Sequence, residues 1–225
     1  MPKGDIKTQA IVLRRTKYGE ADRILNLLTP EGHIAVIAKG VRKAKSRLAG
    51  GIEMFCVSNV GIHQGKSEFG ILTSAKMVEF YQNIISDLSR FELGSSIIKQ
   101  AAKFAEALNT PELFDIVKQC FAGLNDGYDL QLVESWFLLN LMRISGEDIN
   151  LIRDTSGNKL NQNETYVWDS VEQAFSLQPQ GKVGVNEIKI LRLILSVPLA
   201  TVSKVNGIRD SLPEILHIAK SVAKQ

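Results

Sequence analysis

The chain has 225 residues, of which 44 % are hydrophobic and 23 % charged, and its net charge at pH 7 is +3. This hydrophobic fraction can fill a core, which excludes a wholly disordered chain. No uncharged apolar run approaches the roughly 18 residues that a bilayer crossing needs. Lys3 and Asp5 also stand where a secretory signal would be apolar. We therefore expect a cytoplasmic protein without a membrane partner.

The charges are distributed unevenly along the chain. Residues 1–80 carry a net charge of +6, residues 81–181 carry −7, and residues 182–225 carry +4. A basic amino-terminal block beside an acidic middle block predicts a polyanion-binding site at one end of the chain and different partners elsewhere. The alternative is ordinary variation in surface charge without a binding role.

The first 80 residues are predicted to form strands, because turn-forming residues separate short segments that are rich in β-branched side chains. Residues 29–32, Thr-Pro-Glu-Gly, are typical of a tight turn, since proline fixes its φ and glycine accepts a positive one. Five such strands fit a small closed barrel better than an open sheet, and a barrel leaves no exposed edge. The predicted strands are 9–16, 23–29, 33–41, 53–63 and 69–80.

Beyond residue 80 the apolar residues recur at helical spacing, which predicts a second, α-helical domain over 81–225. The run 110–112, Thr-Pro-Glu, is typical of a helix start, with threonine as the cap. Residues 133–145 are apolar almost all round, as in a buried central helix. Further helices are predicted at 187–195, capped by Asn186, and at 210–224.

A short segment, 152–181, interrupts the helical pattern. It contains a turn-like stretch at 154–157 and a possible strand at 165–169, and we interpret it as a small irregular insert or hairpin. The sequence thus predicts an α+β chain. Residues 1–80 form a five-stranded barrel, and residues 81–225 form a helical domain that carries the insert.

Motifs for catalysis or metal binding are weak. Gly61–Ser67 resembles a phosphate-binding loop, but only three residues separate its glycines and a predicted strand follows, so a hairpin turn is the better interpretation. The three histidines stand alone, and Cys56 and Cys120 form neither a C-x-x-C pair nor an expected disulfide. No G-x-S-x-G nucleophile motif occurs. We expect no enzymatic activity, no cofactor and no metal site.

One connection between predicted strands is strongly basic. Residues 38–51, AKGVRKAKSRLAGG, contain five cations and no carboxylate. A barrel holds both ends of such a connection, so its charges can present a defined surface to phosphates. Arginine can bind a phosphate through two parallel hydrogen bonds, whereas lysine acts as a point charge. The predicted DNA-binding residues are Lys39, Arg42, Lys43, Lys45 and Arg47, extended by Arg14, Arg15, Lys17 and Arg23.

Two other interpretations of this connection stay open. It is a solubilising loop without a ligand, or its charges dock acidic protein tails and the protein is an interaction adaptor. Aromatic side chains suited to base stacking are few, chiefly Tyr18, Phe55 and Phe69, and Phe55 is better explained as a core residue. If the connection binds nucleic acid, contacts with the sugar-phosphate backbone should dominate over stacking.

Residues 10–55, AIVLRRTKYGEADRILNLLTPEGHIAVIAKGVRKAKSRLAGGIEMF, resemble the start of the bacterial DNA repair protein RecO family. In that family an A-I-V-L strand leads to a Y-G-E-x-D-R turn, followed by a T-x-E-G-like turn and a K-G-x-R-x-x-x-S-R segment. This chain matches at 18–23, 29–32 and 39–47. Lys39, Arg42 and Arg47 occupy motif positions, while Lys43 and Lys45 are additional charges. From residue 81 onward the resemblance is only architectural.

The resemblance implies an OB-fold barrel that binds single- and double-stranded DNA. It also implies a recombination mediator that anneals complementary strands and, with RecR, helps load recombinase on DNA coated by single-strand-binding protein. In some members the helical domain contacts RecR or receives the acidic carboxy-terminal tail of single-strand-binding protein.

The chain departs from many relatives in its insert. Those relatives carry four zinc-binding cysteines in the region that corresponds to residues 153–181, where this sequence has none. We therefore expect hydrogen bonds and a small core around Tyr166, Trp168 and Phe175 to hold the insert together.

Overall fold

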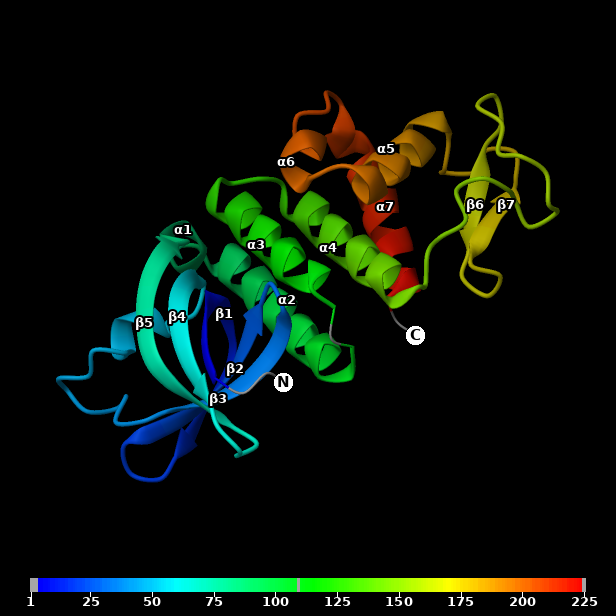
Figure 1. The fold of residues 1–225 in the computed structure, drawn as a ribbon. Helices are drawn as coiled ribbons and strands as arrows, with labels where there is room; N and C mark the ends of the chain where they lie inside the picture. The colour runs from blue at the N-terminus through cyan, green and yellow to red at the C-terminus, as the bar shows by residue number, and fades with distance from the viewer. Residues whose placement is uncertain (1–3, 109, 224–225) are drawn as a thin grey trace. The chain divides into compact units, whose positions relative to one another are not determined.

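The computed structural model describes residues 4–108 and 110–223. Its amino-terminal part consists of five strands that wrap around a common interior (Figure 1). Their order is β1-β2-β3-β5-β4, with β4 pairing back to β1, and this closes a barrel. All pairings are antiparallel except the short parallel one between β3 and β5. The predicted five-stranded OB-fold barrel is confirmed. The strands are β1 (Gly4–Tyr18), β2 (Asp22–Thr29), β3 (Gly32–Ala38), β4 (Cys56–Gln64) and β5 (Gly70–Phe80).

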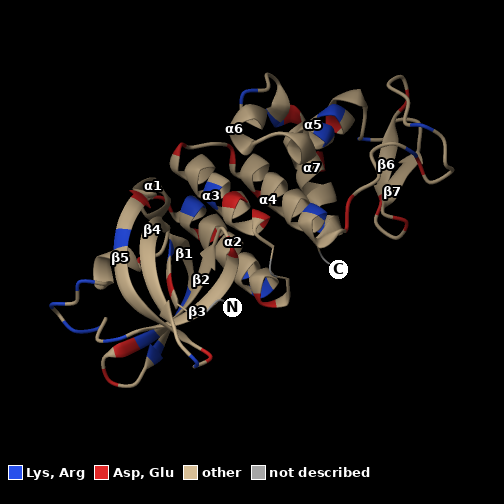
Figure 2. Ribbon diagram, in the orientation of Figure 1, with Lys and Arg blue, Asp and Glu red and all other residues tan. Residues whose placement is uncertain are grey.

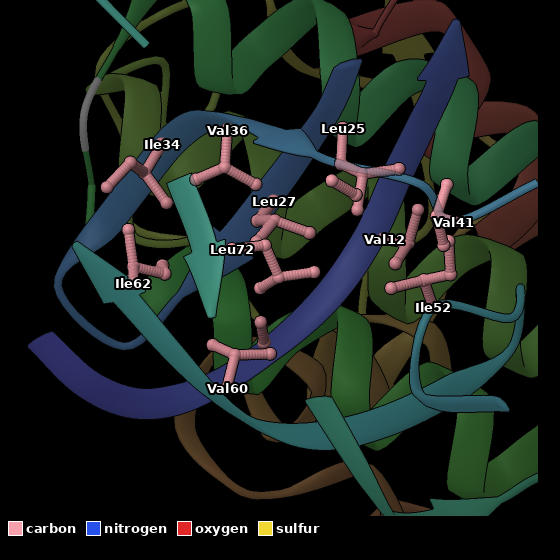
Figure 3. Packing of buried hydrophobic residues seen from close by; sticks show 12 residues of the cluster. Val12, Leu25, Leu27, Ile34, Val36, Val41, Ile52, Val60, Ile62 and Leu72 are labelled. Carbon is pink, nitrogen blue, oxygen red and sulfur yellow. The ribbon is translucent and has the colours of Figure 1, made fainter. Parts of the chain in front are cut away.

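The interior of the barrel is filled by apolar side chains that alternate along the strands, as the pleat requires (Figure 3). Leu25 and Val36 lie in this cluster and are fully buried. Ile11 and Leu28, which face each other across the β1–β2 pairing, are also buried but lie outside the interior cluster. Both faces are therefore buried in the middle of β1, at residues 10–13, and near the end of β2, at residues 27–28, which explains the short uninterrupted apolar runs at these positions.

Two turns match their predicted form. In the β2–β3 turn the Thr29 hydroxyl donates to the carbonyl oxygen of Gly32 at 2.8 Å, and Gly32 has a φ of 113°. Gly61 lies within β4, which runs on to Gln64 before the chain turns back into β5. The stretch that resembles a phosphate-binding loop is thus a hairpin, and no helix follows it.

Three helices pack with the barrel, and residues Met1–Asn125 form one compact unit. They are α1 (Gln82–Ile85), α2 (Leu88–Ala107) and α3 (Glu112–Asn125). The change from strands to helices falls after Phe80, where the domain boundary was predicted, but this compact unit extends to Asn125. Phe55 is buried and contacts Phe91 and Phe121 edge to face, with ring centroids 5.7 and 5.5 Å apart, so it belongs to the core.

Residues Asp126–Gln225 form the second compact unit, built on the helices α4 (Leu130–Ser145), α5 (Val185–Ser196), α6 (Leu199–Val202) and α7 (Ile208–Val222). The central helix α4 is largely buried, as predicted. Its Asn140 is buried and donates to the carbonyl of Ile194 at 3.1 Å, which ties α4 to α5. The predicted cap of α5 is wrong: Gly184 occupies the cap position, and Glu187 accepts from its amide at 2.8 Å.

The insert is an ordered hairpin of two short strands, β6 (Tyr166–Asp169) and β7 (Ala174–Leu177). Tyr166 and Phe175 are buried, and the Trp168 ring contacts Phe175 edge to face at 5.2 Å between centroids. The turn that precedes the hairpin is held by Asp154, whose Oδ1 accepts from the amides of Ser156 and Asn158 at 2.9 Å. Hydrogen bonds and aromatic packing thus hold the insert in the way the sequence predicts.

Candidate nucleic-acid interface

The cationic segment, defined as residues 39–47, is anchored to the barrel at both ends. Before it, β3 ends at Ala38, and within it Val41 is buried in the interior cluster. After it, Leu48 and Ile52 pack against the same cluster. The segment cannot swing as a free loop, because its ends are fixed by buried apolar side chains. Its five cations Lys39, Arg42, Lys43, Lys45 and Arg47 are all exposed.

Hydrogen bonds inside the segment give it a defined course. The amide of Lys43 donates to the carbonyl of Gly40 at 3.1 Å, and the amide of Ser46 donates to that of Lys43 at 3.0 Å. Gly40 has a φ of 62°, a conformation that glycine adopts without strain. Two successive turns therefore shape the segment and distribute its side chains over a compact arc.

The segment is also bound to the turn between β1 and β2. Oδ1 of Asp22 accepts from the amide of Gly40 at 2.6 Å, and the amide of Arg42 donates to the carbonyl of Ala21 at 2.9 Å. The guanidinium of Arg42 donates to the carbonyl of Glu20 at 3.0 Å. A carbonyl orients a guanidinium without neutralising it, so Arg42 keeps its charge, and its donors other than Nη1 remain for a ligand.

The cations predicted on neighbouring strands lie in different places. Arg23 faces Lys17 across the β1–β2 pairing and Ala38 across the β2–β3 pairing, so it adjoins the start of the cationic segment. Two like charges directly opposite each other in a sheet are unfavourable, and a bound anion would relieve this. Arg15 is paired with Glu53 at 3.0 Å. Arg14 instead lines a groove of about 390 Å³ between β1 and α2.

Figure 2 shows Lys and Arg gathered on the connection that follows β3, with no acidic residue inside it. The two acidic side chains of the adjoining turn are Glu20, which is exposed, and Asp22, which is engaged with Gly40. The surface is therefore strongly positive and sits on a rigid frame, which suits a polyanion bound through its backbone charges.

Comparisons with known proteins identify the family of the chain. The family model described as "Recombination protein O N terminal" matches residues 1–81, and the one described as "Recombination protein O C terminal" matches residues 85–222. The chain belongs to the RecO family. A relative named "DNA repair protein RecO", from Dehalococcoides mccartyi strain CBDB1, is 33 % identical over 94 % of this chain and 86 % of its own length. The same-named protein of another strain of that species is 31 % identical over the same shares.

A more distant relative, the DNA repair protein RecO of Listeria monocytogenes serotype 4b, is 29 % identical over 62 % of this chain and 55 % of its own length. These matches confirm the RecO resemblance and place the chain among DNA repair proteins. The two family models cover nearly all of the barrel, the helices and the insert, so the relationship extends well beyond the amino-terminal motifs that indicated it.

Two of the three RecO-like motifs of the sequence meet in space, whereas the turn at 29–32 lies at the opposite end of the β2–β3 hairpin. Residues 18–23 form the end of β1, the turn and the start of β2, and residues 39–42 lie against that turn through the bonds of Asp22 and Arg42. The sequence indicated the cations, but the positioning role of Asp22 was not expected from it. The signal that could have indicated this role is the position of Asp22, an acidic residue next to the predicted DNA-binding residue Arg23.

We also searched the described residues for metal-binding clusters, reactive cysteines and membrane-spanning helices. Among the residues that the structure describes, no three His, Cys, Asp or Glu side chains gather in a way that could hold a metal ion. Cys56 and Cys120 are free and buried, and burial raises the pKa of both thiols, which disfavours the reactive thiolate. Within the same described ranges, no helix combines the length and apolar character that a membrane crossing requires.

Proposed function

We propose that this protein is a DNA-binding recombination mediator that anneals complementary single strands and, with RecR, helps load recombinase on DNA coated by single-strand-binding protein. One observation carries the proposal: five exposed cations, without a carboxylate among them, stand on an arc that the barrel holds at both ends. Membership of a family of DNA repair proteins supports DNA as the polyanion.

The mechanism needs no catalytic acid, base or nucleophile. Lys and Arg side chains that neutralise phosphates release condensed counterions, and this release drives binding that depends on salt and not on sequence. Two strands held on positive surface repel each other less, so base pairing can supply the driving force for annealing. Arg42 and Arg47 would each bind a phosphate through two hydrogen bonds, and the three lysines would add point charges.

The test is a fluorescence titration of labelled single-stranded DNA at several salt concentrations. The variant R42Q/K45Q/R47Q should bind every sequence more weakly, and its log–log salt slope should fall by about 2 for three lost contacts. Replacing Arg42 also removes its hydrogen bond to the adjoining turn and could change the course of the segment. The variant K45Q/R47Q keeps Arg42 and therefore tests the loss of charge alone. The matched control is K182Q/K204Q/R209Q, which removes three exposed cations from the second unit.

Unchanged DNA binding in both segment variants would contradict the proposal. The alternative is an adaptor whose basic segment docks acidic protein tails, which the charge asymmetry of the chain permits because charge alone does not specify the polyanion. In that case a peptide that ends in acidic residues and an aromatic would compete with DNA for the cationic segment. In the mediator proposal, that peptide and DNA bind together, on separate parts of the chain.

A further inference from the structure

A second cationic site lies wholly within the carboxy-terminal unit. A pocket of about 510 Å³ opens between helix α5 and the loop 159–162. On the helix side, Ile188, Lys189 and Arg192 belong to one face, because they follow one another at helical spacing. The facing loop contributes Lys159 and the two amide side chains of Asn161 and Gln162.

The charge of this pocket is uncompensated. No carboxylate lines it, and among residues 4–108 and 110–223 none of its three cations, Lys159, Lys189 and Arg192, forms a salt bridge. The carboxylate of Glu187 is engaged elsewhere, with the Gly184 amide at 2.8 Å and the Ser211 hydroxyl at 2.6 Å. The pocket therefore concentrates positive charge beside neutral hydrogen-bond donors.

The walls of the pocket are fixed by contacts on the protein side. Nη2 of Arg192 donates to the carbonyl of Leu151 at 2.7 Å, which orients the guanidinium and leaves its charge intact. The loop is held by the backbone amide of Asn161, which donates to the hydroxyl of the buried Tyr166 at 2.8 Å. Ile188 is buried and forms an apolar floor. A ligand would thus meet groups that are already in place, which lowers the entropic cost of binding.

We infer that this pocket binds the sugar-phosphate backbone of a second DNA strand. Its three cations and two amide side chains match phosphate and sugar oxygens, and no aromatic side chain lines it for base stacking. The inference rests on the proposed function, because annealing requires two strands and the cationic segment of the barrel supplies a surface for one. Each compact unit then carries its own phosphate site.

The test compares the pocket variant K159Q/K189Q with the control K182Q/K204Q, which removes the same charge from exposed positions of the same unit. Arg192 is left intact because it binds the backbone of Leu151. The readouts are affinity for a labelled single strand and the annealing rate of two complementary labelled strands, at one salt concentration. We expect the pocket variant to lose less than threefold in single-strand affinity but about tenfold in annealing rate. The control should change neither.

The variant K45Q/R47Q separates this inference from the proposed function. Weak single-strand binding in K45Q/R47Q together with normal annealing in K159Q/K189Q would overturn the pocket inference alone. Normal binding and normal annealing in both variants would overturn both proposals. An acidic peptide that binds the wild type but not K159Q/K189Q, while annealing stays normal, would identify the pocket as a peptide site and would also overturn the inference.

Discussion

Oδ1 of Asp22 accepts a hydrogen bond of 2.6 Å from the backbone amide of Gly40. This contact joins the turn after β1 to the start of the cationic segment, across the β2–β3 hairpin. The carboxylate brings a negative charge close to a surface that we propose for DNA. Its position is explained if it serves to hold the segment, since an amide bound to a carboxylate is fixed more strongly than one bound to a neutral acceptor.

Replacing Asp22 tests this positioning role through the sign of its effect. On charge alone, Asp22→Ala would strengthen DNA binding, because it removes a carboxylate from a basic neighbourhood. We expect the opposite, a three- to tenfold loss of single-strand affinity, or about 0.7–1.4 kcal/mol, because the segment loses its attachment at Gly40. Asp22→Asn keeps an oxygen acceptor without the charge and should bind at least as well as the wild type. Tighter binding by Asp22→Ala, in the same titration, would show that the contact does not position the segment.

The barrel could be predicted from the sequence because strands and turns are local signals. The apolar runs, the Thr29–Gly32 turn and the glycines of the hairpins each identify their element without knowledge of the rest of the chain. Element ends were less predictable. β1 extends back to Gly4 because its first residues pair with β4, and this depends on a partner some sixty positions away, as in the pair of Asp5 with His63.

The candidate site was predictable in composition but not in arrangement. Five cations in one connection are visible in the sequence, whereas the Asp22–Gly40 bond depends on the register of the β2–β3 hairpin. The location of Arg14, away from the cationic segment, also depends on strand register. The β1–β2 register shifts between Val12 and Arg14, and this irregularity decides which face each later residue of β1 occupies. A pattern of alternating residues cannot reveal such a shift.

Two adjacent glycines at the end of the cationic connection should respond very differently to substitution. A Cβ on Gly51 would lie 2.5 Å from the backbone carbon of Ala75, whereas a Cβ on Gly50 would meet no atom within 4 Å. Gly51→Ala should therefore lower the free energy of unfolding by about 1–3 kcal/mol, because β5 must shift to admit the methyl group. Gly50→Ala is the matched control and should be close to neutral. Equal stability of the two variants in urea denaturation would show that the connection does not pack on β5 as described.

The turn that begins the insert should depend on a side-chain oxygen and not on a metal. Asp154 is buried, and its Oδ1 accepts from two amides, so Asp154→Ala should lower the free energy of unfolding by about 1–3 kcal/mol. Asp154→Asn retains the acceptor and should lose much less. A metal chelator should leave the melting temperature of the wild type unchanged, since the sequence 153–181 contains no cysteine. Unfolding of the protein by the chelator would contradict this account of the insert.

The contact between β5 and α3 should give a small, pH-dependent contribution to stability. The pKa of Glu79 is lowered, first by the hydrogen bond of 2.6 Å from the Tyr81 hydroxyl and then by Lys118, whose Nζ lies 3.0 Å from Oε1. A lowered carboxyl pKa stabilises the fold above the pKa of the unfolded chain, and this stability is lost as the pH falls through the folded value. Because the Glu79 side chain is 40 % exposed, the contribution at pH 7 should be only about 0.5 kcal/mol.

We therefore expect Glu79→Gln to be slightly less stable than the wild type at pH 7, and the difference to disappear between about pH 5 and pH 3 as the carboxylate is protonated. Glu68→Gln, in the exposed turn between β4 and β5, is the control for the loss of one negative charge. The measurement is urea denaturation of all three proteins across this range. A difference that stays constant with pH would show that Glu79 contributes through packing and not through its charge.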